Sequence, residues 1–574
     1  MDYNCPMTYR HFKHEGWIYA LVFILALAIR IIQLGAMPLT DAEAVPALQA
    51  LRITQDLKPA LSPHPLYILS TAVLFFIYGG GTNFLARLIP ALMGSFLVLV
   101  PLLFTERIKP RPGLLLALFI AIDPGMVALS RQAASPILAI TFLLIALGFF
   151  DKNKLKPAGI FAALALLSGP SIWLGILGIG IAWAIHQGVQ SRKPITPEDA
   201  EQLPPAFNLK ELSIPLIATL ITAGTLFFIV PNGLSAALAS MPAFISRWAA
   251  KSDFPAARFL LSLVIYQPLG ILLAIIAIIR GWWNGSRRII SLSLWFLVAL
   301  LLAIFIPSRE ISDIAWALIP LWGLAALEFA RNVNIFPEER NEVFGVIFLT
   351  AFIWAFAWLD FAGMVWIQNG TREYIMRFWL LIGALLLIVI SLLLVAAGWS
   401  IRTARFGGVW GLALTLGVLG MGGTIGSTGL RGMNHPEIWW SAPMPVQADL
   451  IQASISDLSE WGMGNDNAAP VIISGLDSPA LEWALRDHQV QIVETLDISS
   501  APYFVITPLQ DNPALASTYR GQDFTWRKTY LWNDTLPQEW IRWVALREIP
   551  QAGESIILWA RDDLFLDTTT QTNP

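Results

Sequence analysis

Charged residues are scarce in this chain. They make up 13% of its 574 residues, whereas a soluble domain carries about 25%. Cysteine is almost absent: Cys5 is the only one, so the chain has no disulfide framework. Hydrophobic residues account for 56%, and the mean hydropathy is +0.62. This composition excludes a soluble enzyme, a fibrous protein, a disordered tail and a nucleic-acid-binding protein, and it indicates that the lipid bilayer is the main solvent.

The few charges are unevenly distributed. Residues 427–574 contain 8 Lys and Arg against 19 Asp and Glu, a net charge of −11. Residues 1–426 contain 29 and 21, a net charge of +8. We therefore predict two domains: a mainly α-helical, polytopic membrane domain over 1–426 and an acidic, water-soluble domain over 427–574.

Apolar runs separated by short basic loops set the expected topology. Arg10 and Lys13 precede an apolar stretch that is too long for a cleaved signal peptide, so we expect an uncleaved first helix with a cytoplasmic N-terminus. The positive-inside rule then places the basic loops in the cytoplasm. These loops are Glu106–Arg111, Lys152–Lys156, Arg192–Lys193, Arg280–Arg288 and Arg402–Arg405.

We expect thirteen membrane crossings, and this odd number puts the C-terminal domain outside the cell membrane. The expected spans lie near 17–35, 84–104, 113–129, 136–150, 158–168, 171–187, 212–230, 259–279, 290–306, 314–330, 343–359, 375–397 and 407–426. Gly169-Pro170 could instead be a kink within one helix. The run from Leu66 to Tyr78 is shorter than the ~20 residues that a crossing needs, so we interpret it as a helix at the outer interface, within a first external loop of residues 36–83.

The C-terminal domain shows an α/β pattern. Short apolar runs predict strands at 471–474, 490–496 and 503–507, with a helix at 478–487 between the first two. Two tryptophan pairs, Trp439-Trp440 and Trp282-Trp283, are interpreted as interfacial anchors, although the first pair could also be a sugar platform.

Two carboxylates lie at the start of the external loop. Thr40 and Glu43 have the spacing of a capping box, but Pro46 would then lie inside the helix, where its ring clashes with the carbonyl of Ala42. We therefore expect the helix to begin at Pro46. Asp41 and Glu43 would then lie on extended chain with both side chains on one side.

Other ionisable residues are predicted on the same outer face. They are His64, Arg87, Asp123, Arg131, Arg309 and Glu310. Ionisable residues this close to hydrocarbon are functional candidates, and snorkelling at the interface is the alternative for any single arginine. Carboxylates and arginines together suit transfer of a group from a lipid phosphate. The arginines stabilise the departing phosphate, and a carboxylate accepts the proton of the attacking hydroxyl.

Several ordered motifs carry a resemblance to a known family. They are Asp41-Ala-Glu43, Ser62-Pro-His-Pro-Leu-Tyr67, Ala86-Arg-Leu-Ile-Pro-Ala-Leu-Met-Gly94 and the segment from Asp123-Pro to Ser130-Arg131. With them the chain resembles the GT-C superfamily of glycosyltransferases, in the branch of protein O-mannosyltransferases and lipid A aminoarabinose transferases. The resemblance is clearest over residues 17–150.

The resemblance implies a fold, a reaction and roles for the residues named above. It implies transfer of a sugar from a polyprenyl-phosphate donor to a glycan, lipid or protein acceptor, with inversion, on the outer face. Asp41 or Glu43 would be the catalytic base, and Arg87, Arg131 and Arg309 would lie near the donor phosphate. His64, Asp123 and Glu310 would support the site. No cofactor is required by this scheme, and a divalent metal is not excluded.

The sequence also departs from the family pattern. Ala42 separates two acidic residues that are usually adjacent, and Leu66 and Asp123 replace a proline and a serine of the usual motifs. These departures leave open which carboxylate is the base. They also leave open an inactive alternative, a membrane protein that binds lipid-linked sugars or assists their translocation.

Overall fold

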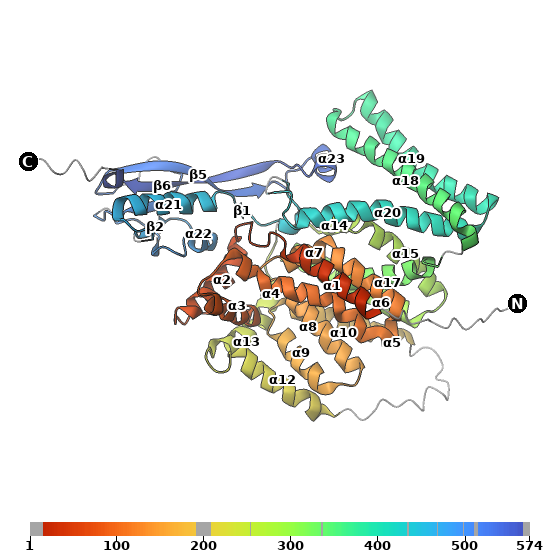
Figure 1. Cartoon of the computed structure of the whole chain (residues 1–574), viewed down its shortest axis with the longest axis horizontal. Helices are drawn as coiled ribbons and strands as arrows, with labels where there is room; N and C mark the ends of the chain where they lie inside the picture. The colour runs from red at the N-terminus through yellow and green to blue at the C-terminus, as the bar shows by residue number, and fades with distance from the viewer. Residues whose placement is uncertain are drawn as a thin grey trace, which may run out of the picture.

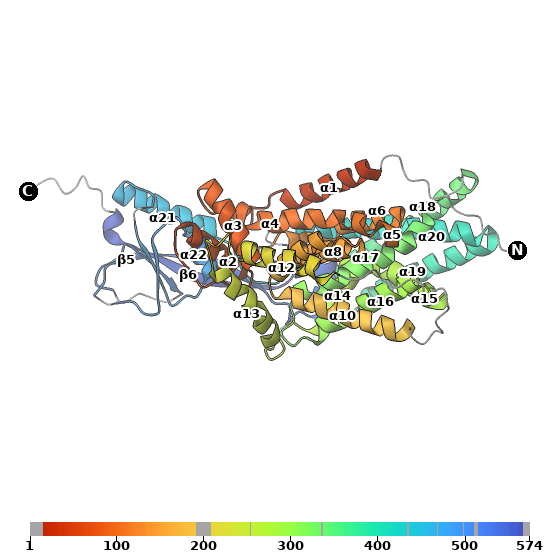
Figure 2. The same ribbon diagram turned by 90° about the horizontal axis from the view of Figure 1, so that it is seen from below.

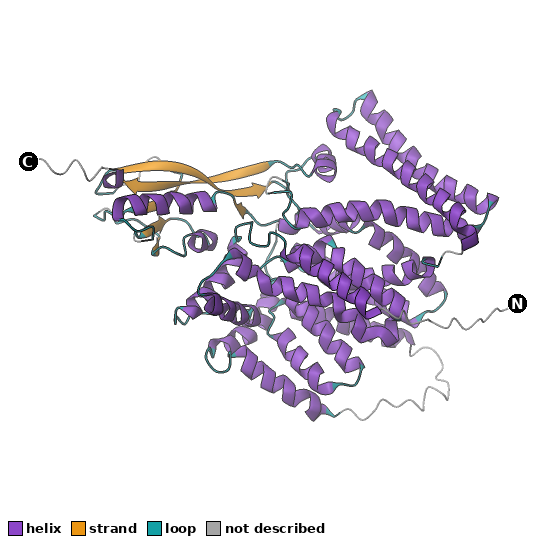
Figure 3. Ribbon diagram, viewed as in Figure 1, coloured by secondary structure: helices purple, strands orange, loops and turns teal. Residues whose placement is uncertain are grey.

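The computed structural model describes residues 15–190, 208–252, 254–334, 337–432, 435–467, 469–497, 499–509 and 515–565. The basic N-terminal residues Arg10 and Lys13 and the predicted loop at Arg192–Lys193 lie outside these ranges. The chain is mainly helical, and the strands are gathered at one end of the molecule (Figures 1 and 3). The view in Figure 2 shows the same arrangement, with the sheet at one end and α15 and α19 toward the other.

Helices and short 3₁₀ turns form the chain up to residue 427. They are α1 (Glu15–Ile31), α2 (Asp41–Thr54), α3 (Pro65–Tyr78), α4 (Asn83–Phe96), η1 (Leu97–Phe104), α5 (Thr105–Ile108), α6 (Pro110–Ile122), α7 (Pro124–Ser130), α8 (Ile137–Asp151), α9 (Leu155–Leu166), α10 (Ser171–Gln190), α12 (Leu209–Gly224), α13 (Asn232–Ser246), α14 (Ala256–Tyr266), α15 (Pro268–Trp283), α16 (Arg287–Phe305), η2 (Ile311–Ile314), α17 (Ala315–Phe329), η3 (Ala330–Asn332), η4 (Pro337–Glu339), α18 (Arg340–Gly363), η5 (Met364–Trp366), α19 (Arg372–Gly398) and α20 (Ile401–Ser427).

The protein is a polytopic membrane protein. Among the described residues, seven helices are long and apolar enough to cross a membrane, or up to nine if each bent helix pair is one span. This count is lower than the thirteen crossings that the sequence suggested, because several expected spans are short. The helices α8 and α9, for example, have 15 and 12 residues. The helices α9 and α10 are separate, with Gly169 at φ +117° between them.

Two expected spans are bent at proline. The pair α6 and α7 is bent by 60°, and the pair α14 and α15 by 96°. Proline supplies no N–H and is tolerated at the first helical position, so Pro124 and Pro268 each begin a new helix. Asp123 joins the two bends, because its carboxylate accepts hydrogen bonds from the backbone of Met126 (2.7 Å) and from Gln267 (3.0 Å).

The C-terminal part contains a mixed six-stranded sheet. Its elements are η6 (Ile438–Trp440), β1 (Met444–Pro445), α21 (Ala448–Met463), β2 (Val471–Ser474), α22 (Pro479–Ala484), β3 (Val490–Val493), β4 (Phe504–Pro508), β5 (Tyr519–Tyr530), α23 (Pro537–Leu546), β6 (Gln551–Arg561) and η7 (Asp562–Phe565). The strand order is β1-β5-β6-β4-β2-β3. The predicted strands β2, β3 and β4 pair in parallel, and β6 pairs antiparallel with both β4 and β5.

The C-terminal part contacts the start of the chain through α22. This short helix packs against α2, and Trp483 donates to the side chain of Asn83 (2.7 Å). Arg486 donates to the carbonyl of Gly81 (2.8 Å), and Arg52 pairs with Glu482. The predicted external loop, residues 36–83, and the sheet domain therefore lie at the same end of the helical bundle (Figure 1).

Candidate functional site

A cavity of about 520 Å³ lies where the external loop meets the C-terminal part. Six segments of the described chain that are distant in sequence line it: the start of α2, residues 62–64 before α3, residues 132–136 after α7, residues 252 and 254 before α14, residues 309–312 before α17, and residues 439–442. Of the predicted site residues, Glu43, His64, Arg309 and Glu310 line this cavity. Asp41, Arg87, Asp123 and Arg131 do not.

The expected start of α2 at Pro46 is wrong. The helix begins at Asp41 with Thr40 as its N-cap, and Pro46 lies inside it. The proline leaves the carbonyl of Ala42 without the hydrogen bond that residue 46 would otherwise donate, and Ala42 and Pro46 both line the cavity. Because residues two apart on a helix point in different directions, Asp41 and Glu43 do not form the expected pair on one face.

Glu43 is a buried ion-pair partner of Arg87. Its Oε1 accepts from Arg87 Nε (2.9 Å) and from the backbone N–H of Ala133 (3.0 Å). Its Oε2 accepts from Arg87 Nη2 (2.8 Å) and from the N–H and hydroxyl of Thr40 (both 3.1 Å). Burial raises the pKa of Glu43, but the charge of Arg87 and these hydrogen bonds outweigh burial, so the pKa lies below its usual value. Glu43 is therefore a fully hydrogen-bonded carboxylate.

Arg87 holds the loop that precedes α2. Besides Glu43, its guanidinium donates to the carbonyls of Met37 (2.7 Å) and Pro38 (2.9 Å). The ring of Trp440 lies 5.6 Å from the guanidinium carbon. Only 1% of the side chain is exposed, so in this conformation a lipid phosphate cannot reach it.

Asp41 binds the C-terminal part of the chain. Its Oδ1 accepts from the hydroxyl of Ser478 (2.9 Å) and from the backbone N–H of Ala480 (3.0 Å). Its Oδ2 lies 2.7 Å from Arg527 Nη2. Asp41 thus links α2 to α22 and β5 and is not directed toward the cavity residues.

Arg131 caps the C-terminal end of α1. Its guanidinium donates to the carbonyls of Arg30 (2.9 Å) and Ile32 (2.8 Å) and, across the molecule, of Thr428 (2.7 Å). A cation at a helix C-terminus satisfies free carbonyls and the helix dipole. Burial, together with the charge of Arg87, lowers the pKa of Arg131 to about 10. Arg131 and Asp123 thus both contact the backbone at helix ends or bends.

Arg309 and Glu310 are the ionisable cavity residues that keep free hydrogen-bonding capacity. Arg309 donates through Nε to the carbonyl of Ile306 (3.2 Å), and within the described part of the chain its terminal nitrogens have no partner. Part of the Glu310 side chain is exposed, although protein surrounds its carboxyl group closely. It accepts a side-chain hydrogen bond from Ser312 (3.2 Å). Water displaced by the surrounding protein and the nearby charge of Asp313 both raise the pKa of Glu310.

Neutral groups complete the cavity wall. Desolvation lowers the pKa of His64 to about 4, so its imidazole is neutral at physiological pH. The hydroxyls of Ser62 and Ser135 are buried and have no hydrogen-bond partner among the described residues. The sequence placed Ser62 in a motif without predicting a role for its hydroxyl, and it did not single out Ser135, because a serine in a loop carries no pattern that distinguishes it.

The interpretation of Trp439-Trp440 as an interfacial anchor is wrong. The two side chains are 2% and 7% exposed, and both line the cavity. Trp439 packs against Tyr266, with ring centroids 5.8 Å apart, and Gln132 donates to its carbonyl (2.7 Å). The sequence could not show that this tryptophan pair is buried beside the cavity, because its position depends on the C-terminal part folding back over α7. Trp282 and Trp283 are exposed, and their anchoring role stays a prediction.

Metal-ligating side chains do not cluster in this site. Among the described residues, no group of three or more His, Cys, Asp or Glu side chains is arranged to hold a metal ion. The geometry is that of a cavity between a helical membrane bundle and a C-terminal sheet domain, lined by the guanidinium of Arg309, the carboxylates of Glu43 and Glu310, and neutral polar groups. This arrangement is the fold of the ArnT structures that the chain matches.

Comparison with solved structures shows which proteins share this fold. The chain matches ArnT from Cupriavidus metallidurans, bound to undecaprenyl phosphate, with a TM-score of 0.54 and 14% identity over 96% of this chain and 99% of that chain. ArnT in the apo state gives a TM-score of 0.53 and 15% identity, over 86% and 93% of the two chains. The Archaeoglobus fulgidus oligosaccharyltransferase, in complex with Zn and sulfate, gives a TM-score of 0.40 and 13% identity, over 86% and 68% of the two chains. No protein-family model and no curated protein sequence matches the chain.

Proposed function

We propose that this protein is a membrane glycosyltransferase that moves a sugar from a polyprenyl-phosphate donor to an acceptor hydroxyl on the extracytoplasmic face. The proposal rests on one observation: the cavity that contains the free Arg309 and Glu310 occurs within the fold of ArnT, a protein whose structure contains undecaprenyl phosphate. The basic loops favour a cytoplasmic N-terminus and an extracytoplasmic sheet domain.

The free groups of the cavity supply the chemistry that this transfer needs. Arg309 would bind the donor phosphate and stabilise the negative charge that it gains as its bond to the sugar breaks. Glu310 would accept the proton of the acceptor hydroxyl while the hydroxyl oxygen bonds to the anomeric carbon. Attack opposite to the phosphate inverts that carbon. The hydroxyls of Ser62 and Ser135 are available to the sugar.

Asp41 and Glu43 do not act as the catalytic base in this proposal, although the family resemblance implied that one of them does. Every oxygen of Glu43 already accepts at least two hydrogen bonds, and Asp41 binds Ser478, Ala480 and Arg527. We therefore assign both as positioning residues, which hold α2 and the C-terminal part around the cavity. Arg87 and Arg131 serve the same framework.

The same observation favours a second candidate function. A chain in which neither carboxylate of the motif is free could bind a lipid-linked sugar without transferring it. Such a protein would keep the cavity and Arg309 but have no working base. This alternative predicts donor binding with no release of polyprenyl phosphate.

The test uses the full chain in lipid nanodiscs with radiolabelled undecaprenyl-phosphate mannose, glucose and aminoarabinose as donors, each offered with a pool of glycan, lipid and peptide hydroxyl acceptors. Donor binding and release of undecaprenyl phosphate are measured for wild type, Glu310→Gln and Arg309→Gln, and also for two exposed control variants, Glu494→Gln and Arg372→Gln. We expect Glu310→Gln to keep binding and to slow release by about 10²–10⁴-fold, Arg309→Gln to weaken binding, and the controls to match wild type. Wild-type turnover by Glu310→Gln would remove Glu310 from the mechanism. Binding of a donor by wild type without release would establish the second function.

A further inference from the structure

A second cavity lies at the end of the bundle opposite the sheet domain. It has a volume of about 620 Å³ and lies between η1, α5, the end of α10, the start of α16, and α17. Its wall is mostly apolar and includes Val100, Phe104, Leu144, Leu292 and Ile319. Clefts of this size bind small ligands in many proteins, and an apolar wall suits a hydrocarbon chain.

Cations surround the mouth of this apolar cavity. Arg107, Arg287 and Arg288 line it together with His186. Arg288 also lines an adjoining cleft of about 540 Å³, whose lining, among the residues that the structure describes, contains six further basic side chains and no acidic one. The six are Lys109, Arg111, Arg280, Arg331, Arg402 and Arg405. Three basic loops that are far apart in sequence thus meet at one place.

Three carboxylates pair with some of these basic residues, and they are too few to neutralise all of the positive charge. Glu328 pairs with Arg280 and Arg331, Asp151 pairs with Arg107 and Glu339 pairs with Arg402. Within the described part of the chain, Arg287, Arg288 and Arg405 form no ion pair. Positive charge therefore remains at the point where the apolar cavity and the basic cleft meet.

The start of α16 adds to this positive potential. Arg287 and Arg288 are its first two residues, and Ser286, its N-cap, makes no side-chain capping hydrogen bond. A helix N-terminus carries free N–H groups and the positive end of the dipole, so cations there are unfavourable unless an anion is close. Ser286 lines the basic cleft, which places the helix end beside the unpaired arginines.

We propose that this end of the bundle binds one membrane phospholipid with an anionic headgroup. An acyl chain would occupy the apolar cavity, and the phosphate would lie between Arg288, Arg405 and the start of α16. We favour a lipid over free phosphate because the apolar cavity and the cations are next to each other. In a phospholipid the acyl chain and the charged headgroup are joined in the same way. Basic pockets between transmembrane helices on the cytoplasmic side bind anionic headgroups in this way.

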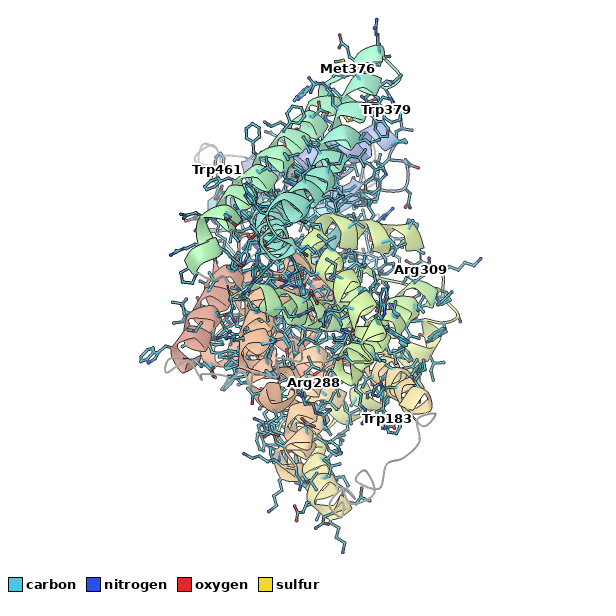
Figure 4. All side chains as sticks on the ribbon, turned by 90° about the vertical axis from the view of Figure 1, so that its right-hand side faces the viewer. Trp183, Arg288, Arg309, Met376, Trp379 and Trp461 are labelled. Atoms are coloured by element: carbon cyan, nitrogen blue, oxygen red, sulfur yellow. The ribbon has the colours of Figure 1, made fainter. Side chains whose placement is uncertain are left out.

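Two exposed tryptophans lie at the same end of the bundle as the apolar cavity and the basic cleft. Trp183 lines the mouth and is 64% exposed, and Trp283, beside the basic cleft, is 86% exposed. Tryptophan is enriched where headgroups meet hydrocarbon. Figure 4 looks onto this end of the molecule, with Trp183 and Arg288 both labelled on it. The proposal does not depend on the proposed glycosyltransferase activity, since it concerns the opposite end of the bundle.

Native mass spectrometry of the full chain, released from nanodiscs of equal parts phosphatidylglycerol and phosphatidylcholine, tests the proposal. Wild type is expected to retain one phosphatidylglycerol in preference to phosphatidylcholine. The double variant Arg288→Gln/Arg405→Gln should weaken this retention by about tenfold or more, because both cations proposed to face the phosphate lose their charge. The matched double variant Arg520→Gln/Arg542→Gln removes two exposed arginines of the sheet domain and should bind as wild type.

A second variant tests the apolar half of the site. Gly323 lines the cavity, and a Cβ added there would lie 3.7 Å from Leu292 Cδ1, at ordinary contact distance. Gly323→Leu should therefore fill the cavity, keep every cation and still lose the lipid. Equal retention of the two lipids by wild type would overturn the proposal. So would displacement of phosphatidylglycerol by excess inorganic phosphate, or unchanged retention in both the arginine double variant and Gly323→Leu.

Discussion

Replacing Glu43 with glutamine tests the assignment of this residue to the framework. The ion pair with Arg87 is buried, with 5% and 1% of the two side chains exposed. Removing one partner of a buried pair costs about 3–5 kcal/mol, because the other charge stays buried without compensation. Glutamine keeps the shape, but its amide nitrogen replaces an oxygen that now accepts at least two hydrogen bonds.

The expected loss can be converted into a melting temperature. An unfolding entropy of about 2.1 cal/mol/K per residue over 574 residues gives roughly 1.2 kcal/mol/K. The Glu43→Gln variant should therefore unfold about 2 to 4 °C below wild type, as followed by tryptophan fluorescence in nanodiscs. Arg520→Gln is the control: it breaks an exposed pair with Asp562, worth at most about 1 kcal/mol.

The difference in melting temperature between wild type and Glu43→Gln should become smaller at low pH. The folded protein lowers the pKa of Glu43, so the ion pair stabilises the fold above the unfolded pKa of about 4.3. The stabilisation is lost as the pH falls through the lower, folded pKa. The difference in melting temperature should be constant from pH 6 to 8 and shrink in acid. An unchanged melting temperature combined with loss of sugar transfer would refute the assignment and show that Glu43 acts in the chemistry.

Three further predictions follow from the site. Gly169→Ala should destabilise the protein by about 1–3 kcal/mol, because Gly169 has φ +117° and a Cβ there would overlap the ring of His64; Gly180→Ala, which meets no atom within 4 Å, should not. Asp41→Asn should increase hydrogen exchange in α22 and raise the KM for the donor while keeping most of kcat. The control variant Asp457→Asn, on α21, should change neither quantity. Loss of kcat alone in Asp41→Asn would instead make Asp41 the base. The rate of sugar transfer should rise with pH through the raised pKa of Glu310, since the base must be deprotonated. His64→Asn should leave this pH profile unchanged between pH 6 and 8, because the pKa of His64 is about 4. A pH profile that shifts in the His64 variant would contradict the assignment of Glu310 as the base.

The sequence by itself determined the solvent and the architecture, but not the bends at Pro124 and Pro268. Long apolar runs require a bilayer because helices without charges cannot remain in water, and the acidic, strand-rich tail required a separate domain. The ordered motifs were sufficient to predict the fold of ArnT. These features depend on composition and on neighbours in the chain, which a sequence displays directly.

Only the tertiary structure decided what the charged residues do. Asp41 binds Ser478, which lies 437 residues further along the chain, and Glu43 binds Arg87 from another helix. No local pattern records such partners, so the acidic motif was expected to be free when both of its carboxylates are occupied. The start of α2 was missed for the same reason: contacts of Glu43 with Thr40, Arg87 and Ala133 hold the helix from Asp41 onward and outweigh the cost of Pro46 inside it. The function of an ionisable group depends on its partners and its burial, and both are properties of the folded chain.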